Sequence, residues 1–265
     1  MNRTSFLWVH MTPFKLGRRP WPLLAVCLAL QTLPAAHAQD TEAAQSPAEP
    51  SKTWAVGAGW WRYSEPEMKL EGPQLMLYGR YDREPSGWPD RLEAELGAAS
   101  LHYSSRSSGS LSHVPMLRGQ ASALWQLEAS AQWRAGLQVD ATWVDLRGTT
   151  SSGYGGYERL NSKAWAVLQY EHPSTASAEA GLLLRGRQQS WLSQANPNLP
   201  DITNTQKRGV YLAYRHSPWQ SAEGTGLSLR PWIRYTRVSD SDQVGADRWY
   251  EPNNRTWQIG LEGRW

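Results

Sequence analysis

Polar or small residues alternate with apolar ones along residues 133–143. Every second residue is apolar, and this face holds Trp133, Ala135, Leu137, Val139, Ala141 and Trp143. A period of two predicts a β-strand with one apolar and one polar face. Comparable segments predict ten strands, over residues 53–63, 73–82, 90–103, 115–127, 131–147, 162–171, 177–192, 208–216, 226–239 and 255–265. The sequence therefore predicts an all-β protein, a ten-stranded antiparallel up-and-down β-barrel.

The connections between these strands alternate between short and long. The four short ones are residues 83–89, 128–130, 172–176 and 217–225. The five longer, polar ones are residues 64–72, 104–114, 148–161, 193–207 and 240–254. Short periplasmic turns with longer outer loops are typical of outer-membrane barrels. A soluble barrel of the lipocalin type has the same strand order, so the polarity of the two faces must decide between them.

Two properties of the faces favour a membrane barrel. Trp residues lie at both ends of an otherwise aliphatic face, as Trp133 and Trp143 do, which matches the aromatic girdles at the two membrane interfaces. The polar face carries more charge than a dry core accepts. The charged residues predicted to face the lumen are Arg118, Arg134, Asp140, Arg185, Arg187, Arg230, Arg234 and Glu262. The alternative is a soluble sandwich whose core is filled by Trp, but we predict a transmembrane β-barrel with a polar lumen.

The pattern of the first 52 residues predicts that the protein is exported from the cytoplasm. Basic residues precede an apolar run at residues 21–33, and Ala36 and Ala38 supply the small residues that a signal peptidase reads. We expect a signal peptide over residues 1–38, with its start at Met1 or Met11. Residues 39–52 are rich in Ala, Gln, Glu, Pro and Ser, which predicts a disordered periplasmic lead-in. The barrel domain then covers residues 53–265.

Residues 255–265 resemble the C-terminal assembly signal of bacterial outer-membrane barrels. The residues that carry the resemblance are Trp257, Ile259, Leu261 and the final aromatic Trp265. Gly263 departs from the pattern, because that family usually has a Tyr there, and the terminal strand of a soluble sandwich is the alternative interpretation. By pattern, the whole chain after the leader is similar to the superfamily of small Gram-negative outer-membrane barrels. The resemblance implies a cell outer-membrane location, with outer-membrane lipid, lipopolysaccharide and the barrel assembly machinery as partners.

Charge and composition narrow the class of protein. Four of the 27 basic residues and none of the 24 acidic residues precede residue 39, so 23 basic residues remain against 24 acidic ones. This balance predicts no nucleic-acid partner. Cys27 lies in the leader, so the exported chain has no disulfide framework. We find no cofactor or nucleotide motif, and we expect a monomer without a cofactor.

Three functions are compatible with this sequence. Ten strands predict a narrow lumen, largely occluded by salt bridges, with any passage restricted to small solutes and favouring anions because Arg predominates. The alternative is ligand binding or adhesion by the outer loops, where the candidate residues are Tyr154, Tyr157, Trp249 and Tyr250. A hydrolase acting on lipid A or peptide is the third interpretation, with His102 as its weak catalytic candidate. We expect no enzyme activity and no metal site, since Asp240-Ser241-Asp242 matches only a fragment of a calcium loop.

Overall fold

The computed structural model describes residues 50–84, 88–127, 130–172, 176–216, 219–220 and 228–264. These residues form one antiparallel sheet and a short 3-10 helix, η1 (Leu192–Gln194). The strands are β1 (Ser51–Ser64), β2 (Met68–Asp82), β3 (Arg91–Ser105), β4 (Gly109–Leu127), β5 (Ser130–Asp145), β6 (Glu158–Glu171), β7 (Ala176–Ser190), β8 (Ile202–Gln206), β9 (Gly209–His216), β10 (Trp219–Gln220), β11 (Ser228–Val238) and β12 (Asn254–Arg264).

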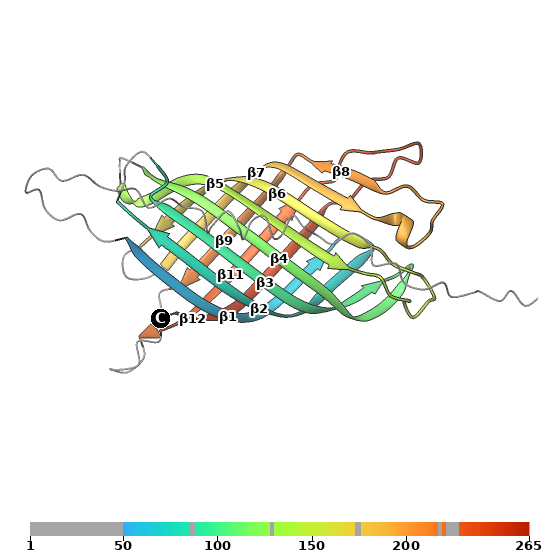
Figure 1. The fold of residues 1–265 in the computed structure, drawn as a ribbon, viewed down its shortest axis with the longest axis horizontal. Helices are drawn as coiled ribbons and strands as arrows, with labels where there is room; N and C mark the ends of the chain where they lie inside the picture. Colours follow the sequence, from blue (N-terminus) through green and yellow to red (C-terminus); the bar gives the residue numbers. More distant parts are fainter. Residues whose placement is uncertain are drawn as a thin grey trace, which may run out of the picture. The chain divides into compact units, whose positions relative to one another are not determined.

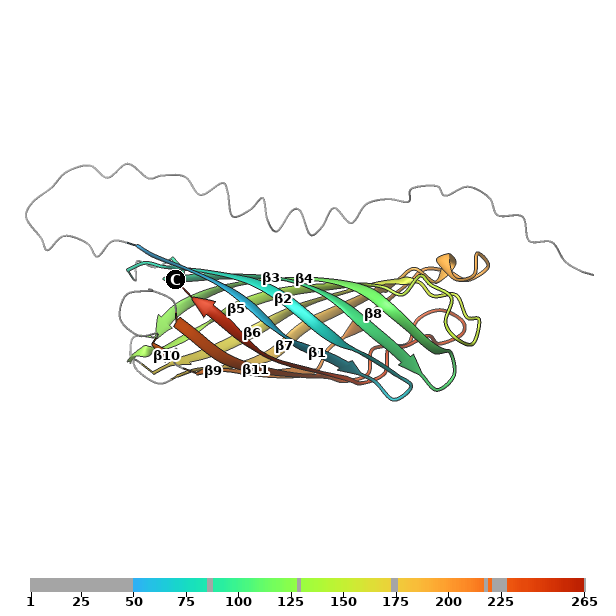
Figure 2. The same cartoon turned by 90° about the horizontal axis from the view of Figure 1, so that it is seen from below.

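Ten of these strands close into a ring, which confirms the predicted ten-stranded barrel (Figures 1 and 2). The ring runs in chain order from β1 to β7, continues through β9 and β11 to β12, and is closed by the pairing of β12 with β1. The other two strands are accessory: β8 extends β9 along β7, and β10 pairs with the start of β11. We call the end of the barrel where β1 begins and β12 ends the terminal end, and the opposite end the loop end.

Two glycines face each other at the middle of the seam between β1 and β12. Gly59 faces Gly260 there. A Cβ atom on Gly59 would lie 2.4 Å from the carbonyl oxygen of Ile259, and one on Gly260 would lie 2.5 Å from that of Ala58. A larger residue at either position would push the first and last strands apart.

Two predicted outer loops are instead mostly strand. The predicted loops 64–72 and 104–114 shrink to turns at residues 65–67 and 106–108, because β2 has 15 residues and β4 has 19. A tilted strand crosses a bilayer with about 9–11 residues, so these hairpins extend past the membrane at the loop end. The lead-in also ends earlier than predicted, since Ser51 and Lys52 already pair with β2. The predicted signal peptide and residues 39–49 lie outside the described residues.

The outward face of the barrel is an apolar band between two aromatic girdles. Aliphatic residues in the band are highly exposed, among them Leu75 at 67%, Leu182 at 64% and Ile259 at 57%. The girdle nearer the loop end, which we call the outer girdle, consists of Trp60, Trp143, Tyr235 and Trp257. The girdle nearer the terminal end consists of Trp54, Trp125, Trp133, Tyr170 and Tyr214. Soluble proteins rarely expose a continuous apolar surface of this kind, whereas a barrel in a lipid bilayer has such a band on its outward face.

Beyond the outer girdle, the polarity of the two faces inverts. The inward face there is a buried apolar cluster, which we call the loop-end cluster: Trp61, Tyr63, Met68, Leu70, Leu101, Val114, Met116, Val144 and Leu146. The outward face there is polar and includes Arg62, Lys69 and His102. This part of the wall meets water rather than lipid, so apolar residues are buried as in a soluble barrel. The predicted polar lumen is therefore bounded by apolar side chains at the loop end. Among the residues that the structure describes, no helix has the length and hydropathy needed to cross a membrane.

Candidate functional site

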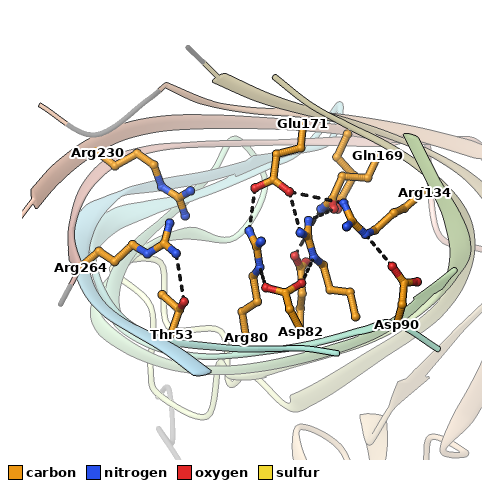
Figure 3. Close-up of polar contacts among 12 residues, drawn as sticks. Thr53, Arg80, Asp82, Asp90, Arg134, Gln169, Glu171, Arg230 and Arg264 are labelled. Atoms are coloured by element: carbon orange, nitrogen blue, oxygen red, sulfur yellow. Dashed lines mark hydrogen bonds and ion pairs between the residues drawn. The ribbon is translucent and has the colours of Figure 1, made fainter. Parts of the chain in front are cut away.

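Charged side chains fill the lumen in layers, and the first lies near the terminal end. This terminal layer, drawn in Figure 3, brings together Arg80, Asp82, Asp90, Arg91, Arg134 and Glu171. It contains three arginines and three carboxylates, so its formal charges balance. Five of them come from β2, β3, β5 and β6, where alternation along each strand points them inward; Asp90 lies just before β3 and is also buried.

Arg91 is the centre of the terminal layer. Its Nε lies 2.6 Å from Asp82 Oδ1, and its Nη2 lies 2.6 Å from Glu171 Oε2. Arg80 also contacts both carboxylates, with its Nη1 lying 2.7 Å from Glu171 Oε1. Charge-assisted contacts of this kind are short and orient both partners, so the layer is a fixed cross-link between opposite walls.

A second group of charges, the central layer, closes the middle of the lumen. Its members are Glu95, Arg118, Gln120, Glu179, Arg215, Arg230, Arg234 and Glu262. Arg215 joins two carboxylates, with its Nη2 lying 3.3 Å from Glu95 Oε2 and its Nε lying 3.8 Å from Glu262 Oε2. Arg118 also pairs with Glu95, and Arg230 pairs with Glu262.

Burial makes the central layer a barrier. Glu262 is 1% exposed, and Glu95 and Arg118 are also buried. Separating any of these partners would leave a charge in a water-poor interior, which costs several kcal/mol, of the order of 3–5. The layer is therefore a closed partition between the two ends of the lumen.

The partition separates two spaces. On its loop-end side is a cavity of about 60 Å³, lined by Arg118, Asp140, Lys163, Trp165 and Tyr211, among others. This is room for a few water molecules. At the terminal end is a wider opening of about 370 Å³, lined by residues of the terminal layer. Charged side chains line both spaces.

Tyr211 forms part of the wall of the smaller cavity because Gly181 gives it room. A Cβ atom on Gly181 would lie 2.0 Å from Cε1 of the Tyr211 ring. The ring packs edge-on against Trp165, with centroids 5.1 Å apart, and its hydroxyl donates a 2.7 Å hydrogen bond to Glu179 Oε1. The glycine thus lets an aromatic ring narrow the lumen without distorting β7.

A third group, the loop-end layer, lies beside the loop-end cluster and shares Tyr63 with it. Its members are Tyr63, Glu65, Arg159, Gln188 and Glu251. Glu251 reaches into the barrel from the segment between β11 and β12. It pairs with Arg159, accepts a 2.7 Å hydrogen bond from the Tyr63 hydroxyl and accepts a 2.6 Å hydrogen bond from Gln188 Nε2. Glu65 Oε1 lies 3.7 Å from Arg159 Nη1.

Two carboxylates thus share one arginine in the loop-end layer. Glu65 lies in the β1–β2 turn, outside the membrane-spanning segments. Burial and the neighbouring Glu251 raise the pKa of Glu65 to about 7, although the nearby Arg159 opposes this rise. The loop-end layer therefore carries a carboxyl group that titrates near neutral pH.

The structure places six of the eight predicted lumen charges on the inward face: Arg118, Arg134, Asp140, Arg230, Arg234 and Glu262. Arg185 and Arg187 are exceptions and are exposed on the outside of the barrel. The pairing of β7 with β6 skips Leu184, and this bulge makes Leu184 and Arg185 both face outward. Every later residue of β7 therefore has the opposite orientation to the one predicted.

The predicted arginine excess is largely neutralised. Four carboxylates outside the predicted set of lumen residues each pair with an arginine: Asp90, Glu171, Glu179 and Glu251. Alternation along β6 and β7 could have identified Glu171 and Glu179. No pattern could have identified Glu251, because it lies in a loop.

The remaining candidate residues are spread over the surface. Tyr154 is 58% exposed and Tyr250 is 52% exposed, whereas Tyr157 and Trp249 are half-buried. His102 is exposed on the outer wall and is paired in register with Glu71; within the described part of the chain it makes no hydrogen bond. No cluster of described His, Cys, Asp or Glu residues could hold a metal ion.

The assembly-signal residues lie on the outward face of β12. Trp257, Ile259 and Leu261 are all exposed there, in register with β1. Trp265 lies outside the described residues.

Comparisons with known proteins give similarity of fold only. No family model matches this chain, and no curated protein matches its sequence. Neisserial surface protein A matches with a TM-score of 0.35 and 11% identity, over 82% of this chain and 98% of that one. The translocator domain of the autotransporter NalP from Neisseria meningitidis matches with a TM-score of 0.43 and 10% identity, over 91% of this chain and 92% of that one. The NanC porin matches with a TM-score of 0.30 and 12% identity, over 78% of this chain and 98% of that one.

These proteins include a surface protein, a translocator and a porin, so their names assign no function to this chain. The class of the protein rests on its own structure. A closed antiparallel barrel with a charged lumen and an apolar band between aromatic girdles is an outer-membrane β-barrel.

Proposed function

We propose that this outer-membrane barrel restricts passage to water and small ions, with a weak preference for anions. The observation that carries the proposal is the buried central layer, a charge-paired partition between two spaces lined by charged side chains. A plug with a purely structural role would not need a charged space on either side of it. The paired side chains of the central layer leave no permanent opening, so conduction requires brief separation of ion pairs and is slow.

The preference for anions rests on the terminal end. Arg264 donates a 3.0 Å hydrogen bond to Thr53 Oγ1, and among the described residues it has no carboxylate partner. Figure 3 shows Arg230 beside it. An unneutralised guanidinium at the mouth of a lumen raises the local concentration of anions. We place this end in the periplasm and the loop end outside the cell, as the predicted signal peptide and the longer loops support.

Widening the central layer is the direct test. We expect single-channel conductance of the wild type in a planar bilayer to be small, and the double substitution Arg118→Ala with Arg234→Ala to increase it severalfold, because two large buried side chains are removed. The control is Arg106→Ala with Arg147→Ala, which removes two exposed arginines. Unchanged conductance in the folded lumen variant, with folding shown by heat-modifiable gel mobility, would refute a path through the central layer.

Recognition by the outer loops is the second candidate function. It is favoured by the exposure of Tyr154 and Tyr250, since tyrosines often anchor protein contacts. If the loops recognise a cell-surface ligand, Tyr154→Ala with Tyr250→Ala should abolish adhesion of fluorescent proteoliposomes to cultured epithelial cells. The barrel should stay folded, because neither ring is buried. Wild-type proteoliposomes that adhere no better than empty ones would exclude this function for these cells.

A further inference from the structure

A groove on the outward face crosses β11, β12, β1 and the start of β2 at the outer girdle. Its volume is about 890 Å³. Toward the middle of the membrane it is lined by the apolar and aromatic side chains of Trp60, Ile233, Tyr235, Trp257 and Ile259. Toward the loop end its charged lining consists of four basic residues, Arg62, Lys69, Arg237 and Arg255, and one acidic residue, Glu65. The carboxylate of Glu65 is paired with Arg159 of the loop-end layer. We call this feature the basic groove.

The same order of side chains recurs on three of the four strands that the groove crosses. On each strand a basic residue lies two positions nearer the loop end than an aromatic one; the pairs are Trp60 and Arg62, Tyr235 and Arg237, and Trp257 and Arg255. Two strand residues span about 6.5 Å. Aromatic rings mark the edge of the hydrocarbon region, so the cations form a row at the depth of lipid headgroups.

The row carries uncompensated charge. Arg237 and Arg255 are directly opposite each other in the β11–β12 register, where like charges repel. Within the described part of the chain, no carboxylate forms an ion pair with Arg237, Arg255 or Lys69. Arg62 has one exposed partner, with its Nε lying 3.5 Å from Glu71 Oε2. A bound anion between the two strands would remove the repulsion.

We infer that the basic groove binds the lipid A part of lipopolysaccharide, a phosphorylated and acylated glycolipid. Its phosphates contact Arg237 and Arg255, and its acyl chains lie against the apolar side chains below them. Guanidinium groups suit this role because they form paired hydrogen bonds with phosphate oxygens. The inference rests on the proposed orientation, with the loop end outside the cell. It does not depend on passage through the lumen, so a silent barrel would leave it unaffected.

Native mass spectrometry of the refolded chain with bisphosphorylated lipid A tests the inference. We expect the wild type to retain lipid A and Arg237→Ser with Arg255→Ser to bind it about tenfold more weakly or worse, because two charged hydrogen-bonding groups are lost. Arg237→Lys with Arg255→Lys should retain part of the affinity. Lys69→Ser is a milder variant that should weaken binding without disturbing the β11–β12 seam.

The matched control is Arg106→Ser with Arg248→Asn, which removes the same charge from exposed loop positions. Asparagine suits position 248, where φ is 53°. This control should bind lipid A as the wild type does. Three results would each overturn the inference: undiminished binding by the Arg237 and Arg255 variants, equal binding of dephosphorylated lipid A, or equal retention of phosphatidylglycerol.

Discussion

Replacing Glu262 with alanine should lower the free energy of unfolding of the barrel by about 3–5 kcal/mol, the cost of leaving a buried charge without its partner. Glu262 is 1% exposed and pairs with both Arg215 and Arg230. Arg215 would keep Glu95, but Arg230 would lose its only ion pair among the described residues. Urea unfolding in lipid vesicles, followed by Trp fluorescence, measures the loss.

The control for this prediction is an ion pair on the outside of the barrel. Glu71→Ala removes the exposed partner of Arg62 and should cost at most about 1 kcal/mol, since water already solvates both groups. Similar losses for the two variants would show that the central layer is hydrated in the membrane. It would then be a poor barrier, and the proposed restriction on passage would fail with it.

The loop end of the barrel should become less stable as the pH rises from about 4.5 to about 7, the range between the ordinary pKa of Glu65 and its raised value. A carboxyl group whose pKa is raised by folding binds more protons in the folded state than in the unfolded state over this range. The contribution of protonated Glu65 to the stability of the loop end is therefore fully present at low pH and is lost as the pH rises through 7. The loss amounts to about 3 kcal/mol.

Glu65→Gln should remove this pH dependence, because glutamine stays neutral. Amide hydrogen exchange in residues 239–253, compared at pH 5 and pH 8 after correction for the intrinsic rates, reports on whether Glu251 stays in place. Glu67→Gln is the matched control, since Glu67 lies two residues away in the same turn and is exposed. Loop protection in the wild type that does not change with pH would contradict the prediction.

The ring of ten strands was predictable because lipid and a charged lumen impose opposite polarity on alternate residues. In β5, for example, Leu137 and Val139 face outward while Gln138 is buried inside. The alternation is misleading where the environment changes. Beyond the outer girdle Leu70 and Val114 are inside and Lys69 is outside, so the polarity there does not predict a strand, and residues 64–72 and 104–114 were predicted as loops.

The candidate site was less predictable than the fold, for two physical reasons. A single bulged residue, Leu184, reversed the faces of the second half of β7, and a two-residue period cannot reveal such an insertion. The loop-end layer depends on Glu251, which reaches Arg159 across 92 residues of sequence. Contacts of this kind are set by the closed ring and not by any local pattern.

The seam between β1 and β12 has a consequence for the order of assembly. It joins Trp60 to Ile259, so the ring closes through some of the most sequence-distant contacts in the chain. Contacts of that kind form slowly. Until they form, β1 and β12 are free edges whose backbone groups lack partners. Unpaired backbone groups are unfavourable in hydrocarbon, and other chains can pair with them. Folding of this barrel is therefore expected to be limited by its last step, and a copy that stalls before closure is the form most prone to aggregate.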